Sequence, residues 1–511
     1  MNDWTAGYVA DVDYTFGYYT ELNPRRIPLA FLNAGLTAPE SVTACELGFG
    51  QGVSANIHAA ASGTRWFGTD FNPAQAGFAR ALATASGAGV QLVDQPFTEF
   101  CARGDLPDFD YIGIHGIWSW ISDENRGVIV DFVRRKLAVG GVLYISYNTQ
   151  PGWAAMVPLR DLLTEHAEVM GAPAHGIVRR IEDALGFAEK VMAVNPAYAR
   201  ANPQVAERLT RIKGQNRNYL AHEYFNRDWL PMSFSRLAEW LAPARLSYAC
   251  SAHYLDHIDA LNLSAEQRTL LSEIPDAMFR QTVRDFMVNQ QFRRDYWVRG
   301  ARRLNVPEQA KALRATQVLL AQPRADVNLK VTGSLGEATL QEAVYGPILD
   351  ALVSHQPMTI GQIEQSVHNR GIAFAQLMQA VTVLVGAGSL VAVQEDTVVS
   401  KAKEQSDKLN AFICERARGS GDIGFLASPV SGGGVAVNRF QQLFLLAKAQ
   451  GKELPSEWAK YAQQALAAQG QKVLKDGKTL ESADENIAEL AAQAQAFNDK
   501  HLPLLKALGI A

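Results

Sequence analysis

Residues 42–148 alternate between short apolar runs and longer amphipathic segments, and this alternation constrains the fold more than any other feature of the sequence. The apolar runs predict buried strands at 41–48, 64–70, 90–93, 109–114 and 141–146. The segments between them predict helices at 53–61, 73–86 and 124–137. Strands that are separated by helices run parallel, so the pattern predicts an α/β fold with a doubly wound sheet. Ligands bind such sheets at the carboxyl ends of the strands.

A glycine-rich turn, Glu46-Leu-Gly-Phe-Gly-Gln-Gly52, follows the first predicted strand and precedes a helix. Glycines at this spacing let backbone amides approach a ligand, and the N-terminus of the helix presents N–H donors to it. Asp70 ends the second predicted strand, where a carboxylate can accept both hydroxyl groups of a ribose. The dinucleotide fingerprint has its third glycine three residues after the second, where this chain has Val53. Because Glu46 also suits a cation better than a pyrophosphate, the turn favours S-adenosylmethionine, which carries a sulfonium and an ammonium group.

The turn resembles the E/D-x-G-x-G-x-G loop of the class I methyltransferases and matches every fixed position. Four further segments resemble the bacterial subgroup with a methyltransferase regulatory domain, which includes the rickettsial lysine methyltransferases that act on outer-membrane proteins. These segments are YIGIHGIWSW (111–120), SYNTQPGW (146–153), YLAHEY (219–224) and FLASPVSGGG (425–434). The resemblance implies a Rossmann-like methyltransferase sheet, S-adenosyl-L-methionine as cofactor, and methyl transfer, with a protein lysine as the preferred acceptor.

The resemblance also implies a set of cofactor-binding residues, which are Glu46, Gly48, Gly50, Gly52, Asp70, Phe71, Asp94, Phe97, His115 and Gly116. In that set the glycine loop surrounds the methionine end, Asp70 binds the ribose, and the stretch from Asp94 lies beside the adenine. The predicted catalytic residues are His115, Trp118, Tyr147, Tyr219 and Glu223. A lysine acceptor must first lose its proton, which His115 or Glu223 could take, and aromatic rings would stabilise the charged product. For Trp118 a position in the core is the alternative.

Residues 1–305 are predicted to form the methyltransferase core. Tyr14, Tyr18 and Tyr19 precede the first strand and could belong to an N-terminal lid over the cofactor. A mainly helical stretch at about 151–241 predicts an insertion over the active edge of the sheet. Two β-like runs, 245–250 and 291–298, are then expected to return to the same sheet. A group of basic residues there predicts a solvated surface, with an acidic partner as the alternative: Arg293, Arg294, Arg299, Arg302 and Arg303.

The C-terminal half predicts a linker at 306–335, a winged-helix-like module at 336–405 and a helical region at 406–511. In the module, three helical patterns precede an expected hairpin at 389–400. Residues 337–400 hold six acids and one arginine, so a DNA duplex would be repelled and a protein contact is favoured. Gly432-Gly-Gly434 is expected to be a loop that connects two domains.

Composition sets the outer limits of the prediction. The net charge of −4 argues against a nucleic-acid partner, and no run of about 20 apolar residues predicts membrane insertion. Four cysteines lie far apart, so no metal site is expected, and the absence of a secretory signal predicts a cytoplasmic enzyme. The predicted partner is a protein substrate or a small-molecule acceptor, and a homodimer is left open. A cofactor-binding regulatory or scaffold protein is the alternative to an enzyme.

Overall fold

A seven-stranded sheet forms the centre of the computed structural model, which describes residues 8, 15–40, 42–172 and 175–511. Its strand order is β3-β2-β1-β4-β5-β7-β6. The strands are β1 (Thr43–Leu47), β2 (Arg65–Thr69), β3 (Val90–Val93), β4 (Phe109–Ile114), β5 (Leu137–Asn148), β6 (Leu246–Ser251) and β7 (Phe292–Arg299). Strands β1 to β5 run parallel, and β7 runs antiparallel to both β5 and β6. The predicted doubly wound sheet is confirmed, and the two late runs join it as expected.

Successive residues of each strand face opposite sides of the sheet, and each side has its own helical layer. Ala44, Trp66 and Tyr111 pack with one layer, and Cys45 and Ile112 pack with the other. The first layer contains α1 (Ile27–Asn33), α2 (Val53–Ser62) and α3 (Pro73–Ser86). The second contains α4 (Phe97–Phe100), α5 (Asp123–Lys136) and α11 (Phe234–Leu241). Because both faces are covered, the parallel strands are almost continuously apolar.

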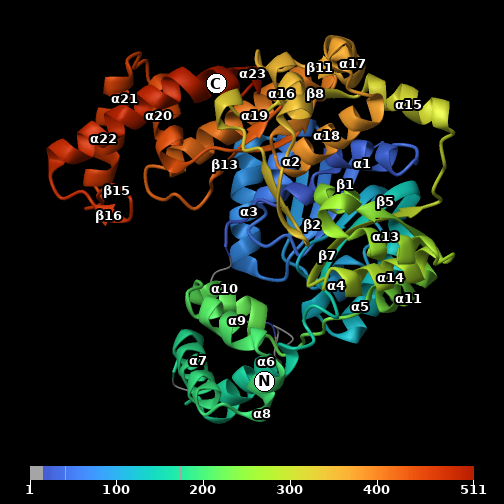
Figure 1. Ribbon diagram of the computed structural model, residues 1–511. Helices are drawn as coiled ribbons and strands as arrows, with labels where there is room; N and C mark the ends of the chain where they lie inside the picture. The colour runs from blue at the N-terminus through green and yellow to red at the C-terminus, as the bar shows by residue number, and fades with distance from the viewer. Residues whose placement is uncertain (1–7, 9–14, 41, 173–174) are drawn as a thin grey trace.

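Residues 157–224, between β5 and β6, form a helical insertion that extends away from the sheet (Figure 1). Its helices are α6 (Val157–Val169), α7 (Ile177–Ala193), α8 (Ala197–Ala201), α9 (Gln204–Lys213) and α10 (Arg217–Tyr224). They enclose a hydrophobic cluster of their own, which includes Trp153, Ile181 and Leu209. Three more helices, α12 (Asp259–Asn262), α13 (Ala265–Ser272) and α14 (Ala277–Met287), connect β6 to β7.

Two expectations for residues 306–405 are wrong. The segment 306–335 is not a plain linker, because it holds α15 (Val306–Ala315), β8 (Gln317–Leu320) and β9 (Lys330–Gly333), the last paired with β10 (Gly336–Thr339). The expected second strand of the wing, at 397–400, is instead the start of α19 (Asp396–Arg416). Its supposed partner β12 (Leu390–Ala392) pairs with β8, which also binds β11 (Met358–Thr359). A winged helix is therefore not confirmed.

Long-range packing explains why residues 397–400 are helical. Ala402, Ser406 and Leu409 of α19 are buried at helical spacing, and the helix packs against α2 and α3 of the core. Asp396 in its first turn also interacts favourably with the helix dipole. The three helices predicted before it are present as α16 (Glu342–Ala351), α17 (Ile360–Ser366) and α18 (Phe374–Gly386).

The remaining C-terminal region is mainly helical, as predicted. After the hairpin β13 (Phe425–Ser428) and β14 (Gly433–Ala436) come α20 (Arg439–Ala449), α21 (Pro455–Ala467), the short pair β15 (Leu474–Lys475) and β16 (Lys478–Thr479), α22 (Ala483–Ala496) and α23 (Leu502–Ala507). Their hydrophobic cluster includes Val53 and Ile57 of α2, so this region packs directly on the core. Within the described part of the chain, no helix combines the length and apolarity needed to cross a bilayer.

Candidate active site

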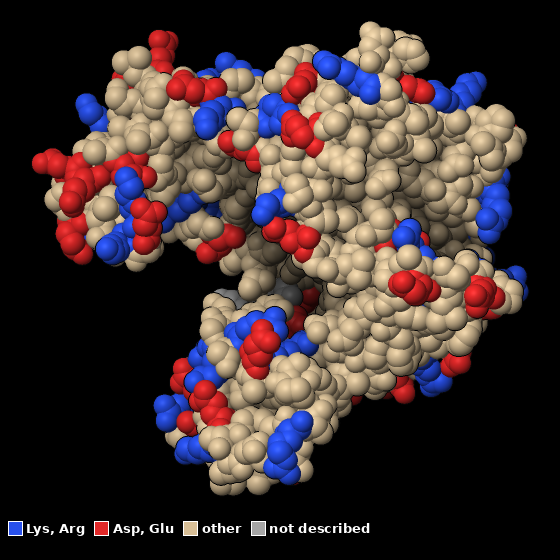
Figure 2. All heavy atoms as spheres, in the orientation of Figure 1, with Lys and Arg blue, Asp and Glu red and all other residues tan. Residues whose placement is uncertain are grey.

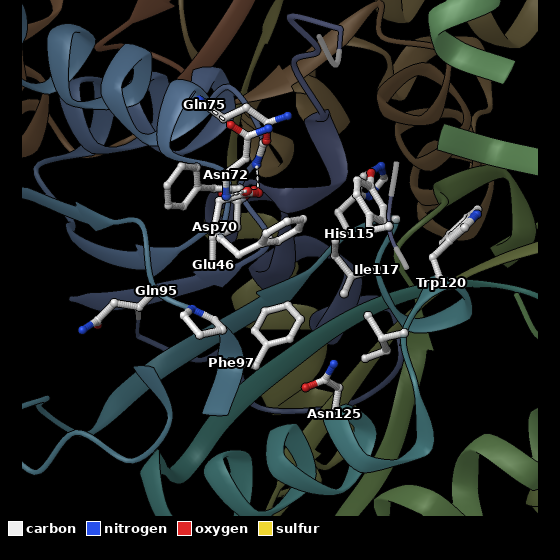
Figure 3. A pocket seen from close by; sticks show the side chains of 18 of the residues that line it. Glu46, Asp70, Asn72, Gln75, Gln95, Phe97, His115, Ile117, Trp120 and Asn125 are labelled. Atoms are coloured by element: carbon white, nitrogen blue, oxygen red, sulfur yellow. Dashed lines mark hydrogen bonds between the residues drawn. The ribbon is translucent and has the colours of Figure 1, made fainter. Parts of the chain in front are cut away.

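A cavity lies at the carboxyl ends of strands β1 to β4, and we call it the strand-end cavity (Figure 3). It holds about 1120 Å³ of empty space, counted out to its opening. Each strand contributes the residues at its end or just after it. These are Glu46 and Gly48 to Gly50 for β1, Asp70 to Asn72 for β2, Gln95 to Phe97 for β3, and His115 to Ile117 for β4. The topology thus brings together segments that are far apart in the sequence.

The glycine turn after β1 adopts a backbone conformation that would be strained for residues other than glycine. Gly48 has a φ of +76° and Gly50 a φ of +56°, both in the left-handed region. A Cβ atom on Gly48 would lie 2.4 Å from Ile117 Cδ1. Gly52, also in the left-handed region, begins α2, and a Cβ atom there would lie 2.5 Å from Ala79 Cβ. Gly48 and Gly50 therefore line the cavity, whereas Gly52 allows α2 and α3 to pack closely and does not line it.

Two carboxyl groups are buried in the wall of the cavity. Asp70 accepts hydrogen bonds from the backbone N–H groups of Gly50 (2.9 Å) and Asn72 (3.0 Å). Burial raises the pKa of Asp70 to about 6. Burial, with a contribution from the charge of Asp70, raises the pKa of Glu46 to about 8. The Glu46 Oε2 atom has no hydrogen-bond partner among the described residues. A ligand with a hydrogen-bond donor could bind to this acceptor.

His115 lies beneath Tyr19, the lid residue that lines the cavity. The two rings lie 4.0 Å apart between centroids, and His115 Nδ1 lies 2.8 Å from Tyr144 Oη. Burial lowers the pKa of His115 to about 4, so its imidazole is neutral at pH 7. The backbone N–H of Tyr19 donates to Ser54 Oγ on α2 at 2.9 Å, which fixes the lid over the glycine turn.

Aromatic and acidic groups from the lid and from α10 lie beside the cavity. The ring of Tyr8, which lines it, lies 5.7 Å from that of Phe71 and 5.4 Å from that of His222. Trp120 lines it too, and its Nε1–H donates to the backbone carbonyl of Glu223 at 3.2 Å. Burial raises the pKa of the Glu223 side chain to about 7. Burial also raises the pKa of the Tyr8 hydroxyl, with smaller contributions from the charges of Asp70 and Glu223.

The C-terminal hairpin holds the lid in place. Tyr18 Oη accepts a hydrogen bond from the backbone N–H of Gly434 at 2.7 Å and lies 3.1 Å from His58 Nε2. A Cβ atom on Gly434 would lie 2.7 Å from the Tyr18 ring, so a side chain there would displace the ring. Of the predicted connecting loop at 432–434, Gly433 and Gly434 instead belong to β14 and lie against Tyr18. Tyr14, the third predicted lid residue, lies outside the described residues.

The structure brings most of the predicted cofactor-binding residues to the cavity wall: Glu46, Gly48, Gly50, Asp70, Phe71, Phe97, His115 and Gly116. Asp94 is not among them, because its carboxylate faces outward and pairs with Arg80 at 3.2 Å. Gln95, one residue later, lines the cavity instead. The predicted site at the end of β3 was therefore offset by one position, since the end of this short strand is hard to locate from sequence.

Two predicted catalytic residues lie in the core rather than at the cavity. Trp118 is fully buried in a 3-10 turn, and its Nε1–H donates to Met232 Sδ. Tyr147 is also fully buried, and its hydroxyl donates to Asp295 on β7. Tyr219 and Glu223 lie on α10 beside the cavity without lining it. Alternating aromatics next to a strand end do not reveal which side of the sheet each ring will occupy.

Sequence reasoning missed several polar and aromatic residues of the wall, which include Tyr8, Asn72, Gln75, Gln95 and Asn125. Two of them could have been predicted from the sequence, because Asn72 and Gln95 directly follow predicted strands. Gln75 and Asn125 come from the first turns of helices that follow these strands, a position that the alternating pattern also locates. Among the described residues, no three histidines, cysteines or acids gather as a metal site would require.

Comparisons with known proteins show which chains this one resembles in sequence and in fold. A family model described as a predicted methyltransferase regulatory domain matches residues 216–299, which run from α10 to β7. An uncharacterised protein of Synechocystis sp. is 41% identical over 99% of both chains. An uncharacterised protein of Rickettsia prowazekii is 25% identical over 55% of this chain and 51% of its own. The structure of PKMT2 from Rickettsia typhi in complex with AdoHcy shares the fold, with a TM-score of 0.68 and 16% identity over 94% of this chain and 98% of that one.

Proposed function

The chain belongs to the methyltransferase family that carries this regulatory domain, and we propose that it transfers a methyl group from S-adenosylmethionine to lysine side chains of a protein substrate. The observation that carries the proposal is the pair of buried acids beside a glycine turn in the left-handed region. Glu46 has an oxygen without a partner among the described residues, and burial raises the pKa of both acids. A positively charged nucleoside would supply the missing partners.

The residues of the strand-end cavity fit this cofactor in charge and in chemistry. Glu46 and the turn Gly48 to Gly50 would hold its ammonium-bearing end, and Asp70 would accept the ribose hydroxyl groups. Phe71 and Phe97 offer rings for its base, and Gln95 brings an amide oxygen that has no partner within the described chain. When bound, the cofactor supplies a methyl group on a positively charged sulfur, which a neutral amine can attack.

Glu223 is the candidate that receives the proton of the acceptor amine. A lysine ammonium has a pKa near 10.4 in water and must be deprotonated before it can act as a nucleophile. Burial holds the pKa of Glu223 at about 7, so its carboxylate can take a proton at neutral pH. His115, which is neutral and hydrogen-bonded to Tyr144, is better placed to position groups than to accept a proton. Tyr8, Trp120 and Tyr219 would stabilise the methylated cation through their ring faces.

A protein acceptor is favoured by the shape of the surface near the cavity. Figure 2 shows a broad hollow between the helical insertion and the C-terminal helices, with charged side chains on both of its sides. The helices α3 and α10, which lie beside the strand-end cavity, also flank this hollow in Figure 1. Such an opening admits a folded surface or a peptide segment, whereas a small-molecule site is normally enclosed.

The test is to incubate the enzyme with methyl-labelled cofactor and a protein extract, and then to separate proteins from small molecules. Hydrolysis of the labelled proteins should release methylated lysine. Asp70→Asn should abolish the labelling, whereas Asp105→Asn, a change at an exposed acid that pairs with Arg103, should leave it unchanged. Label that appears only in small molecules, or in proteins on residues other than lysine, would contradict the lysine proposal.

A further inference from the structure

A second cavity lies between strands β6 and β7 and the helices α12, α13 and α14, and we call it the arginine cavity. It holds about 1150 Å³ of empty space, counted out to its opening, and it shares no lining residue with the strand-end cavity. All of its lining residues fall between Tyr248 and Asp295, inside the segment matched by the regulatory-domain model. Five of them are arginines: Arg268, Arg280, Arg284, Arg293 and Arg294.

Two of these arginines are already neutralised by the protein. Arg293 is buried and pairs with Asp285 at 2.5 Å and with Asp295 at 2.9 Å. Arg294 pairs with Glu21, in the turn that follows the lid residue Tyr19. These contacts correct the expectation of a solvated basic surface at 293–294, because both side chains bind carboxylates of the same chain. They serve the scaffold and are not available to a ligand.

The other three arginines have no carboxylate within ion-pair distance in the described chain. Arg280 donates through Nε and Nη2 to the backbone carbonyl of Ile274, and Arg284 donates through Nη2 to that of Asp256 at 2.9 Å. Backbone carbonyls orient a guanidinium without cancelling its charge, and further N–H donors remain on both groups. Arg268, exposed on α13, makes no side-chain hydrogen bond with any described residue.

The acids of the arginine cavity offset these charges only in part. Asp295 is committed to Arg293. Asp256, which accepts a hydrogen bond from the Ser251 hydroxyl at 2.7 Å, and Asp259, at the start of α12, form no ion pair with an arginine among the described residues. Three guanidinium groups therefore share the concave space with two such carboxylates, so positive groups are in excess, and an anion that binds between the arginines would balance them.

We propose that the arginine cavity is a binding site for a small anionic ligand that carries a phosphate or a carboxylate group. The planar guanidinium fork matches both groups, because each offers paired oxygen acceptors. Arg268, Arg280 and Arg284 reach the site from α13 and α14, and the Ser251 hydroxyl lies in the wall formed by β6. The site rests on no step of methyl transfer, so it stands or falls independently of the proposed function.

The test measures binding of inorganic phosphate and of citrate to the full chain by calorimetry, with sodium chloride at matched ionic strength as the reference. We expect one of the two probes to bind at a single site, which also identifies the preferred group. Arg268→Gln and Arg284→Gln should each weaken that binding at least tenfold. Arg418→Gln, a change at an exposed arginine that pairs with Glu415 in α19, is the matched control and should have no effect.

Two results would overturn the proposal. One is the absence of binding by either probe, and the other is binding that Arg268→Gln and Arg284→Gln leave unchanged. Because Arg268 is exposed and makes no side-chain hydrogen bond among the described residues, its replacement should preserve folding. Affinity for S-adenosylmethionine is measured on the same samples. It should be retained in both variants, which separates a lost anion site from a damaged methyltransferase site.

Discussion

The strand-end cavity and the Arg293 cluster both bury ionisable side chains, but the two regions give these side chains different partners. In the cluster, Arg293 is surrounded by Asp285 and Asp295 of the same chain, so its charge is balanced inside the fold. In the cavity, Glu46 and Asp70 are buried and form no ion pair with any described residue. Burial raises the pKa of the acids in both places, to about 6 for Asp70 and for Asp285, so the two regions differ in the neighbouring cation and not in the pKa. A buried ionisable group with an internal partner thus identifies scaffold, and one that lacks a partner identifies the place of a ligand.

Removing Arg293, the internal partner of two buried acids, should have the largest effect on stability. Arg293→Ala leaves Asp285 and Asp295 buried without their cation, so we expect a loss of about 3–5 kcal/mol in the free energy of unfolding. Denaturant unfolding measures this loss. Arg236→Gln, at an exposed ion pair with Glu239, should change stability by less than about 0.5 kcal/mol. If the triple change of Arg293→Met, Asp285→Asn and Asp295→Asn is as unstable as Arg293→Ala, the cluster is not held by charge balance.

Removing the ligand's partner should affect binding far more than folding. The N–H groups of Gly50 and Asn72 bind different oxygens of Asp70, so Asp70→Asn keeps an acceptor for one of them and loses the charge that would bind the ribose. We expect affinity for S-adenosylmethionine to fall roughly a hundredfold, since two charge-assisted hydrogen bonds are weakened. Calorimetry measures the affinity, and thermal unfolding checks the fold. Unchanged affinity would place the ribose elsewhere.

The unpaired acid should also make the ligand-free protein sensitive to pH. The pKa of Glu46 rises from its ordinary value of 4.5 to about 8 on folding, so the folded state keeps a proton that the unfolded state loses. The stability contribution of this proton is present below about pH 4.5 and is lost as the pH rises to 8. Glu46→Gln should abolish this decline and recover on the order of 4 kcal/mol at pH 8. Identical pH profiles for the two proteins would mean that Glu46 is not buried as described.

The smallest effect is expected at the hairpin that holds the lid. Gly434→Ala would push a Cβ atom to 2.7 Å from the Tyr18 ring and so shift the neighbouring Tyr19. We expect roughly fivefold weaker cofactor binding, about 1 kcal/mol, with little change in melting temperature. Gly424→Ala is the matched control, because a Cβ atom on Gly424 has no neighbour within 4 Å. Equal affinities of the two variants would show that the hairpin does not position the lid.

Local patterns were sufficient to predict the sheet and the centre of its site. The glycine turn, Asp70 and the strand ends follow from short-range periodicity, and the structure places them around one cavity. Features that depend on distant partners were not predictable. Residues 397–400 have a strand-like sequence but continue a helix because α19 packs on α2. Arg293 looked like a surface residue because Asp285 lies on another element.

The contact between Tyr18 and the C-terminal hairpin has a consequence for the order of biosynthesis. Gly434 follows Tyr18 by 416 residues, so the ribosome has translated most of the chain before this hydrogen bond can form. A nascent chain from which only the sheet has emerged would possess the glycine turn, both acids and the contacts of the tyrosines with Ser54 and His58, but it would lack the hairpin contact to Tyr18. The protein would then become able to hold the methyl donor only late in translation, when the hairpin emerges.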